Sequence, residues 1–313
     1  MKVSILIHNL NRAQILERCL ASVAAQTYRP VEVVILDAGS IDESNKIIDQ
    51  NLQIMLGKGM EAKSLSCLPM GVAASRNFAA GQASGELLCA IDNDATFAFP
   101  DSIDRIARLF KSNNHLAVVS ARIVSGDTSV MDPLSWVYRR SKKKWAGKQF
   151  KTFTFTGAGF CIRTKSFWEV GGFWDHLKYS REEEELSLAL INKGWDLLYC
   201  PKIVVKHYPD PRGRLSLINR RYVELTNGLL IYWRRFPLPI ALLAICARIC
   251  SISVKIVFRE KVFPTKALHA VSKSIQEWKR YNLQRVPVSF NAVWKYVYLH
   301  FSGGIREVND ERH

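Results

Sequence analysis

Residues 87–94 constrain the fold more than any other stretch of the sequence. Residues 87–91 are all apolar and predict a strand buried in the middle of a sheet. Asp92 and Asp94 follow directly, and residues i and i+2 of extended backbone point the same way. An Asp-x-Asp triplet also occurs in ordinary polar turns, so the triplet alone does not define a site. At the carboxyl end of a strand in an open α/β sheet, however, two such carboxylates suit a divalent cation, Mg²⁺ or Mn²⁺.

The first forty residues predict a parallel sheet. Two short apolar runs, Val3–His8 and Val31–Leu36, are expected to be buried strands, and apolar residues recur at helical spacing between them. We expect this helix to begin at Asn11, with Asn11 and Gln14 forming a capping box. The order strand, helix, strand predicts a right-handed βαβ unit and an α/β fold.

Two polar residues of the next segment are candidates for ligand binding. Asp37 ends the second strand at a glycine-containing turn, where it either accepts a hydrogen bond from a nucleotide base or ribose, or caps the following helix. A third strand is predicted near residues 53–56 and a helix over residues 71–80. Arg76 lies on that helix, where an arginine either pairs with a phosphate or is solvated.

These segments together resemble the nucleotide-binding half of the GT-A glycosyltransferases, most closely the inverting, mostly bacterial family 2. Besides the first two strands, the resemblance is carried by Asp37–Asp42, Ser75–Asn77, Ser84–Glu86 and Ala90–Asp94. It implies a Rossmann-like, mostly parallel sheet flanked by helices. It also implies that Asp37 contacts the nucleotide base and that Asp92 and Asp94 hold a metal and the donor diphosphate. For Arg76, our own expectation is a second positive charge at these phosphates. Ala38 stands where the family often has a second Asp, so UDP- and dTDP-linked donors both remain open.

The resemblance continues on the acceptor side of the chain. Thr156–Arg163 matches the acceptor-side strand of the family, which implies that Gly159 contacts substrate. His207 ends a predicted strand and resembles the family's histidine near the metal or diphosphate. Imidazole is an acceptable Mn²⁺ ligand, so His207 is a candidate metal ligand, with a structural hydrogen-bonding role as the alternative.

An acidic cluster at residues 182–185 supplies the candidate catalytic base. Together with Leu186 it matches the family's pattern of an acidic pair, one residue, an acid and a leucine. The resemblance implies that Glu183 is the base, with Glu182 beside it at the substrate. From the residues alone, acids at a helix N-terminus are also favoured by the macrodipole. Helical spacing predicts that Glu183 faces inward and that Glu185 points away.

Charge and cysteine content bound the remaining function classes. The net charge is +16, and from Tyr208 onward 18 Lys and Arg stand against 7 Asp and Glu, a balance of +11. This balance indicates an anionic membrane or a phosphorylated substrate, because no nucleic-acid-binding motif accompanies it.

The seven cysteines include no CxxC pair, which favours reduced thiols and a cytosolic active site. Cys246 and Cys250 fit helix packing better than metal binding. The first residues read as a strand and not as a signal peptide.

Two basic regions are candidate membrane contacts. Residues 139–148 predict an exposed, solvated loop; alternatively this loop meets an anionic acceptor or lipid headgroups, with Trp136, Tyr138 and Trp145 at the interface. Farther along, a helix over residues 217–232 is followed by an uncharged run at 236–247. That run is too short to span a bilayer and, with Trp233, Arg234 and Arg235 before it, resembles a membrane-surface element. Residues 265–281 and 290–301 predict two further helices.

The sequence therefore predicts a GT-A catalytic domain over residues 1–208 and a basic, helical, membrane-associated extension over 209–313. The expected activity is sugar transfer with inversion from a nucleotide diphosphate sugar to a hydroxyl of a glycan or lipid-linked acceptor in cell-surface glycan synthesis. The expected location is the cytoplasm, peripheral on the inner face of the cell membrane. One alternative is a non-catalytic scaffold of the same fold, since Glu replaces the more usual Asp at the base position. Another is a nucleotide-dependent oxidoreductase, disfavoured because no Gly-x-Gly-x-x-Gly follows the first strand.

Overall fold

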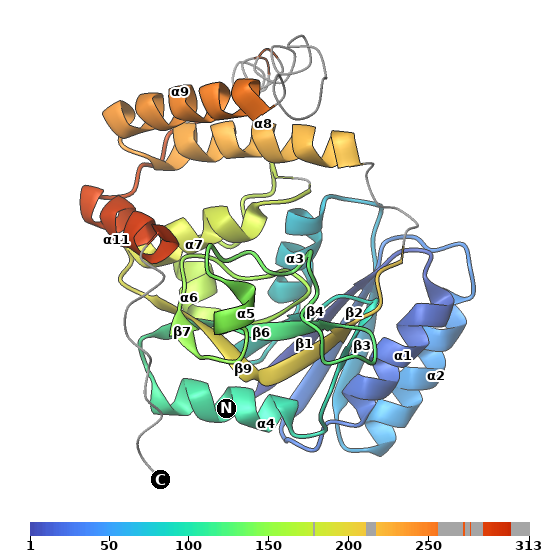
Figure 1. Ribbon diagram of the computed structural model, residues 1–313. Coiled ribbons are helices and arrows are strands. Elements are labelled where there is room, and N and C mark those ends of the chain that lie inside the picture. Colours follow the sequence, from blue (N-terminus) through green and yellow to red (C-terminus); the bar gives the residue numbers. More distant parts are fainter. Residues whose placement is uncertain (178, 211–216, 256–271, 273–275, 277–283, 302–313) are drawn as a thin grey trace.

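The computed structural model describes residues 1–177, 179–210, 217–255, 272, 276 and 284–301 (Figure 1). The N-terminal part alternates strands and helices, as the sequence predicts. In chain order its elements are β1 (Val3–Asn9), α1 (Ala13–Ala24), β2 (Val31–Asp37), α2 (Ser44–Gly57), β3 (Glu61–Ser66), α3 (Val72–Gly81) and β4 (Leu87–Ile91).

The middle of the chain completes the sheet and adds helices around it. Its elements are β5 (Ala95–Phe97), α4 (Ser102–Ser112), β6 (Leu116–Ser125), α5 (Lys142–Trp145), β7 (Phe150–Lys151), β8 (Gly159–Arg163), α6 (Thr164–Glu169), α7 (Glu182–Asn192) and β9 (Asp196–His207). Three helices follow among the described residues: α8 (Leu217–Arg235), α9 (Leu238–Lys255) and α11 (Phe290–Phe301).

The strands of the described chain form one mixed sheet in the order β3-β2-β1-β4-β8-β6-β9-β5, with β7 beside β9. Strands β1, β2, β3, β4, β6 and β9 run in one direction, and β5, β7 and β8 run in the other. The expected α/β fold with a mostly parallel sheet is therefore confirmed. Consecutive residues of β1 alternate between the two faces of this sheet: Ile5 packs with α1, α2 and α4, while Leu6 packs with α3, α6 and α7.

The C-terminal helices are packed onto the helix layer that covers one face of the sheet. Leu230 in α8 and Tyr296 in α11 belong to the same buried cluster as Leu186 in α7 and Leu6 in β1. In Figure 1, α8 and α9 form a layer above α7, and α11 lies against α7. Within the described ranges, no helix is both long and apolar enough to cross a membrane.

Two local predictions for the N-terminal part are wrong. Asn11 has a positive φ of 51° and does not cap α1, which begins at Ala13. Instead, the Ala13 N–H donates to the Asp42 carboxylate, so a partner distant in sequence satisfies the helix end. Residues 53–56 belong to α2 rather than to a strand, since Ile48 and Met55 are buried at helical spacing. The third strand is β3, a mostly polar segment that contains no apolar run from which a strand could be predicted.

The basic segment 139–148 is partly packed against the protein, not fully solvated. Arg140 is buried, and its guanidinium lies 4.1 Å from the ring centroids of both Trp145 and Phe150. Tyr138 is also buried and meets Trp136 edge to face. The expectation that these aromatic rings form a membrane interface is therefore wrong for Tyr138, because its ring belongs to an internal cluster with Phe150 and Tyr199.

Other predictions for the C-terminal half have mixed outcomes. The helices over 217–232 and 290–301 are confirmed by α8 and α11, whereas residues 265–281 lie almost entirely outside the described residues. Cys246 and Cys250 are exposed on α9, so the expectation that they pack is wrong. His207 ends a strand as predicted: β9 runs over Asp196–His207, with an irregularity where its pairing with β6 shifts register.

Candidate active site

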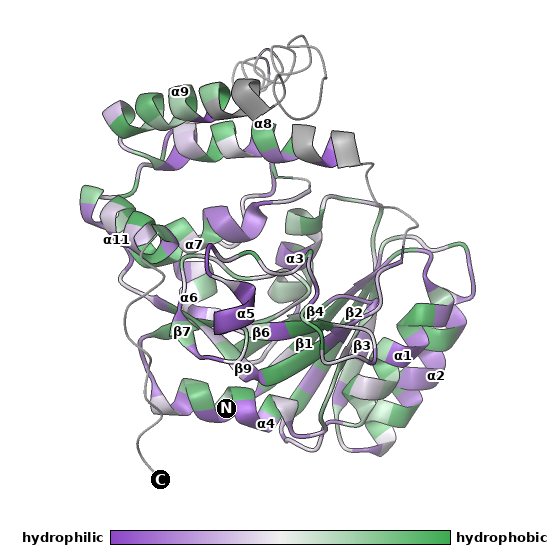
Figure 2. Cartoon of the chain, in the orientation of Figure 1, coloured by the Kyte–Doolittle hydropathy of each residue, from purple (hydrophilic) through white to green (hydrophobic). Residues whose placement is uncertain are grey.

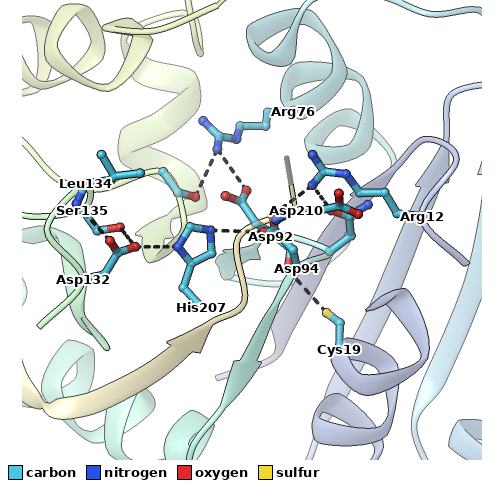
Figure 3. Close-up of polar contacts among 12 residues, drawn as sticks. Arg12, Cys19, Arg76, Asp92, Asp94, Asp132, Leu134, Ser135, His207 and Asp210 are labelled. Carbon is cyan, nitrogen blue, oxygen red and sulfur yellow. Dashed lines mark hydrogen bonds and ion pairs between the residues drawn. The ribbon is translucent and has the colours of Figure 1, made fainter. Parts of the chain in front are cut away.

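Asp92, Asp94 and His207 converge at one edge of the sheet (Figure 3). The two aspartates follow β4, and His207 ends β9, which pairs with β5 so that His207 lies opposite Ala95. One ligand atom from each of the three residues lies within 4.8 Å of the others. Asp94 and His207 are buried, whereas 43% of the Asp92 side chain is exposed. The strand-end argument from the sequence thus leads to a three-residue cluster.

The imidazole of His207 is held between two carboxylates. Its Nδ1 lies 2.5 Å from Asp132 Oδ2, and its Nε2 lies 3.4 Å from Asp94 Oδ1. Burial opposes protonation, but the hydrogen bonds to Asp132 and Asp94 raise the pKa of His207 to about 9. A carboxylate behind a ligating histidine fixes the ring orientation, which is a common arrangement around protein-bound metals.

The donor set fits a divalent cation of the Mg²⁺ or Mn²⁺ type. Two carboxylates supply hard oxygen ligands, and a neutral imidazole is a ligand that Mn²⁺ accepts. Asp94 is already charged, because its partners His207 and Arg12 hold its pKa below the usual value despite its burial. Since a ligating nitrogen must be unprotonated, His207 would have to release a proton in order to hold a cation here.

Arg12 was not predicted from the sequence as a site residue. Its Nη1 lies 3.0 Å from Asp94 Oδ2 and donates to the Asn93 side chain at 3.1 Å. It precedes α1, which places it beside the Asp-x-Asp turn. Asp132 was missed as well. Both residues lie far from residues 92–94 along the chain, and no local motif marks them.

Arg76 links the Asp-x-Asp turn to the N-terminus of α7. Its guanidinium lies 3.7 Å from Asp92, 3.2 Å from Glu182 and 3.1 Å from Glu183. It also donates to the Gly157 carbonyl at 3.1 Å. The sequence placed Arg76 near phosphates; the structure places it between the candidate metal ligands and the candidate base.

The four acids at the start of α7 have four different environments. Glu182 is buried, and burial together with the Glu183 carboxylate raises its pKa to about 8. Glu183 lines the cavity described below, with 15% of its side chain exposed. Glu184 forms an ion pair with Arg181 and accepts a hydrogen bond from Tyr296. Thus Glu182 would carry a proton near neutral pH while its neighbour faces the open space.

The environment of Glu185 differs from the expectation. Its side chain is fully buried and lies 2.6 Å from Arg235 Nε and 3.3 Å from Arg234 Nε. It does point away from the cavity, but into the contact between α7 and α8 and not to solvent. The same contact removes Arg234 and Arg235 from the membrane-facing edge to which the sequence assigned them.

Two glycines near β8 have different surroundings. The predicted substrate residue Gly159 does not line the cavity; a Cβ at this position would lie 3.0 Å from Val205 Cγ2, so the glycine allows close packing of strands. Gly157 does line the cavity. A Cβ there would overlap the Glu183 carboxylate and lie 2.8 Å from Arg76 Nη2. Gly157 is therefore the glycine whose lack of a side chain leaves room for the site.

Asp37 is buried at the end of β2, outside the cavity lining. It accepts hydrogen bonds from Asn9 Nδ2 at 3.0 Å and from the Ser40 N–H at 2.8 Å. It does not cap α2, because the carboxylate that accepts from the Ser44 N–H belongs to Asp42. The carboxylate of Asp37 thus orders the turn that follows β2.

A cavity of about 930 Å³ brings most of these side chains together. Asp92, Asp94 and His207 line it from the sheet edge, Arg76 lines it from α3, and Glu183 lines it from α7. His8 also lines it, and burial with nearby Arg76 lowers the pKa of this histidine to about 4. The cavity therefore combines a cation-binding cluster, a carboxylate that faces open space, and an arginine between them.

Comparison with known proteins agrees with this arrangement. The model of a protein family described as glycosyl transferase family 2 matches residues 4–171, more than half of the chain. The chain therefore belongs to glycosyl transferase family 2, and the resemblance inferred from its motifs is confirmed.

The individual relatives match only part of this chain. An uncharacterised glycosyltransferase of Nostoc sp. is 33% identical over 136 residues, which are 43% of this chain and 41% of that protein. The glucosyl-dolichyl phosphate glucuronosyltransferase of Haloferax volcanii is 26% identical over 183 residues, 55% of this chain and 56% of that protein. The matched part thus spans about half the length of these curated relatives.

The fold is similar to that of a mannosyltransferase from Pyrobaculum calidifontis, solved in complex with GDP-Man and Mn²⁺. The TM-score is 0.57 at 17% sequence identity, with 95% of this chain and 84% of that chain covered. This similarity confirms the GT-A fold expected from the sequence.

Proposed function

We propose that this protein transfers a sugar, with inversion, from a nucleotide diphosphate sugar to a hydroxyl group of an acceptor. The observation that carries the proposal is that one cavity is lined by Asp92, Asp94 and His207 as well as by Glu183. Displacement of a diphosphate by a hydroxyl requires both charge stabilisation at the leaving group and a base at the nucleophile.

The leaving-group side of the reaction is assigned to the sheet edge. Asp92, Asp94 and His207 would hold Mg²⁺ or Mn²⁺, which would neutralise the charge that develops on the diphosphate. Arg76, 3.7 Å from Asp92, would contribute a second positive charge to the same phosphates. Asp94 is prevented from shifting by its bond to Arg12.

The base is assigned to Glu183. A general base must face the substrate and be unprotonated before the reaction. Glu183 faces the cavity, whereas the raised pKa of Glu182 makes the latter a poor proton acceptor near neutral pH. We propose that Glu182 supports the site next to the substrate, and that it helps hold Arg76 in place.

The remaining assignments follow the family resemblance. Asp37, at the end of β2, is proposed as the residue that contacts the nucleotide base of a UDP- or dTDP-linked donor. Its present partners, Asn9 and Ser40, would keep it oriented. Gly159 is proposed to act on substrate only through its backbone at the start of β8, directly after Gly157 and Ala158, which line the cavity.

The acceptor is proposed to be a glycan or a lipid-linked sugar used in cell-surface glycan synthesis. The name of the Haloferax relative, which contains a dolichyl phosphate, supports a lipid-linked acceptor. We assign residues 1–208 to the catalytic domain and 209–313 to a basic extension that holds the protein on the inner face of the cell membrane. The exposed aromatic rings of α11 support this location.

The substitution Asp94→Asn tests the metal centre. We expect it to abolish Mn²⁺-dependent binding of nucleotide sugars, because it removes the charge from the buried ligand nearest His207. Binding is measured by calorimetry with UDP-, dTDP- and GDP-sugars, each with Mn²⁺, Mg²⁺ or chelator. Asp104→Asn, on the surface of α4, is the control. Release of nucleoside diphosphate that is unchanged in Asp94→Asn, or in chelator, would exclude this mechanism; absence of release from the wild type would favour the scaffold alternative.

A further inference from the structure

The cavity has a second region whose charge is opposite to that of the sheet edge. Arginines from four different segments line this part: Arg139, Arg181, Arg220 and Arg248, here called the basic wall. Another part of the lining carries the carboxylates of Asp92 and Asp94 after β4 and of Glu182 and Glu183 at the start of α7, here called the acidic floor. One cavity thus contains a region suited to a cation and a region suited to an anion.

Two members of the basic wall are already neutralised within the protein. Arg181 forms an ion pair with Glu184, and Arg220 donates to Glu224 at 2.9 Å. Arg139 and Arg248 differ from them, because no carboxylate of the described residues lies within ion-pair distance of either. The uncompensated positive charge of the wall is therefore carried by Arg139 and Arg248.

Arg248 is held in an unfavourable environment for a lone cation. It lies on α9 with its Nε buried and without a hydrogen-bond partner. Burial, together with the nearby Arg181 charge, lowers the pKa of Arg248. A buried N–H group without a hydrogen-bond acceptor costs free energy, and an anion placed against Arg248 Nε would supply that acceptor, in addition to the longer-range attraction of Glu184 and Glu224.

Arg139 reaches the same region from the loop before α5. Its guanidinium lies 5.2 Å from the ring centroid of Phe301, at the end of α11. His300, next to this ring, also lines the cavity, and burial together with Arg139 lowers its pKa to about 4. Since His300 is then neutral, the positive charge available to a ligand here belongs to the arginines.

The donor does not account for the basic wall. In the proposed function, the donor diphosphate lies on the acidic floor, where a bound cation and Arg76 compensate its charge. A second anionic group would give the buried Nε of Arg248 a hydrogen-bond partner and would pair with the exposed Arg139. The other substrate in the cavity is the acceptor. We propose that the acceptor carries an anionic group, a phosphate or a carboxylate, which binds Arg139 and Arg248. This proposal rests on the proposed function and names the chemical class of its acceptor.

Three matched probes test the proposal without donor or metal: an octyl hexoside, the same hexose linked to octyl diphosphate, and an octyl hexuronide. The wild type should bind at least one anionic probe about tenfold or more tightly than the neutral hexoside, as charge-assisted hydrogen bonds imply. The diphosphate and uronide arms separate a phosphate from a carboxylate. The advantage should shrink as salt is added.

Substitution of the two uncompensated arginines should remove this preference. In Arg248→Gln and Arg139→Gln, the anionic probe should lose most of its advantage while the neutral hexoside binds as before. Arg108→Gln on the exposed surface of α4 is the matched control and should retain the full preference. Binding of UDP or GDP with Mn²⁺ should change by less than about twofold in all three variants, since these arginines lie outside the acidic floor.

Several outcomes would overturn the proposal. One is equal or undetectable binding of all three probes by the wild type. Another is an anion preference that survives both Arg248→Gln and Arg139→Gln. Loss of nucleotide binding in these variants, as large as the loss of anionic-probe binding, would assign the arginines to the donor instead. Failure of the wild type to bind any nucleotide sugar would reject the proposed function, while the probe ratios would still decide whether the wall binds anions.

Discussion

Arg76 connects the two sides of the proposed chemistry through a single side chain. It lies within 3.7 Å of Asp92 and is bonded to Glu183 on α7. The rings of Phe160 and Phe173 lie about equally far from its guanidinium, with centroids at 5.5 and 5.6 Å. A guanidinium held between carboxylates and ring faces has little freedom to reorient. The positions of the metal ligands and of the base are therefore coupled.

The small size of residue 157 makes this coupling possible. In Gly157→Ala, the new methyl group would displace the ends of the Glu183 and Arg76 side chains. Both are flexible ends, so we expect the melting temperature to be nearly unchanged and kcat/KM to fall by about 10- to 100-fold, the effect of a small misplacement of catalytic groups. Gly147→Ala is the control, since nothing lies within 4 Å of its Cβ position. Wild-type kcat/KM in Gly157→Ala would show that neither side chain needs its present position.

Substitution of each neighbouring acid by glutamine separates the base from its supporting residue. Glu183→Gln should keep nucleotide binding but lose about 10²- to 10⁴-fold in turnover, the usual contribution of a general base. Glu182→Gln should cost far less, because an amide replaces an acid that is protonated at neutral pH, with a pKa of about 8. Single-turnover rates with saturating donor compare the two. The assignment is wrong if Glu182→Gln is the inactive variant and Glu183→Gln is not.

At this scale, sequence predicts residues that follow from local backbone geometry. Asp92 and Asp94 come from a strand end with alternating side chains, and the resemblance adds His207 and Glu183. Arg12, Asp132 and Gly157 were missed because their importance arises from contacts with residues distant in sequence. Asp132, for example, acts on His207, 75 residues later. No spacing rule applies over such a separation.

Among the secondary-structure elements, α7 contacts both the cavity and the C-terminal helices. Its first turn contributes Glu182 and Glu183 to the cavity edge, and its next residues face α8 and α11. Glu185 carries the contact with α8 because its carboxylate is the partner of both Arg234 and Arg235. The N-terminus of α7 is thus fixed from two sides, by Arg76 and by α8.

Removal of the Glu185 charge should therefore destabilise the fold. We expect Glu185→Gln to lower the free energy of unfolding by about 3–5 kcal/mol, because it leaves the buried guanidinium of Arg235 and the half-buried guanidinium of Arg234 without their carboxylate. Urea unfolding at neutral pH measures the change. Glu61→Gln, whose partner Lys2 lies at the surface, should cost less than about 1 kcal/mol. A loss in Glu185→Gln no larger than in this control would show that water or another group replaces the carboxylate.

The elements that sequence predicts well are those with an apolar periodicity of their own. Strand β4 is a continuous apolar run and β1 and β2 are largely apolar, while α8 and α11 repeat apolar residues at helical spacing. β3 was misplaced because it is a polar strand at the edge of the sheet, where only β2 pairs with it. Helical spacing predicts only that Glu185 points away from Glu183; its burial against α8 did not follow from the sequence, because two arginines 49 and 50 residues away decide its environment.

For the molecule as a whole, the outer surfaces of α9 and α11 are unusually apolar. On α11, exposed aromatic side chains recur at helical spacing opposite the buried face: Phe290, Trp294, Tyr298 and Phe301. On α9, Leu238, Leu242 and Leu243 are exposed, and Figure 2 shows largely hydrophobic residues along this helix. Exposed apolar surface of this kind often marks an interaction site.

We expect this surface to bind anionic vesicles, with the net charge of the C-terminal part adding attraction at low salt. Trp294→Ser should reduce the bound fraction, with about a tenfold weaker affinity from the loss of one buried aromatic ring. Co-sedimentation with anionic and neutral vesicles at two salt concentrations measures it. Trp168→Ser, also exposed but on α6, is the control. Equal loss in both variants, or no sedimentation of the wild type, would contradict membrane binding through α11.

The single hydrophobic cluster shared by α7, α8 and α11 sets a limit on engineering by recombination. Residues of these helices pack together in one buried layer, and two arginines of the basic wall are attached to it: Arg181 directly precedes α7 and Arg220 lies on α8. In a chimera that exchanges only the C-terminal helices with those of a relative, the core side chains of the two parts would pack poorly against each other. On the proposed role of the basic wall, a chimera that transfers acceptor preference must therefore include α7, α8 and α9 together with the loop that carries Arg139, and a crossover point before Arg139 keeps all four arginines in one block.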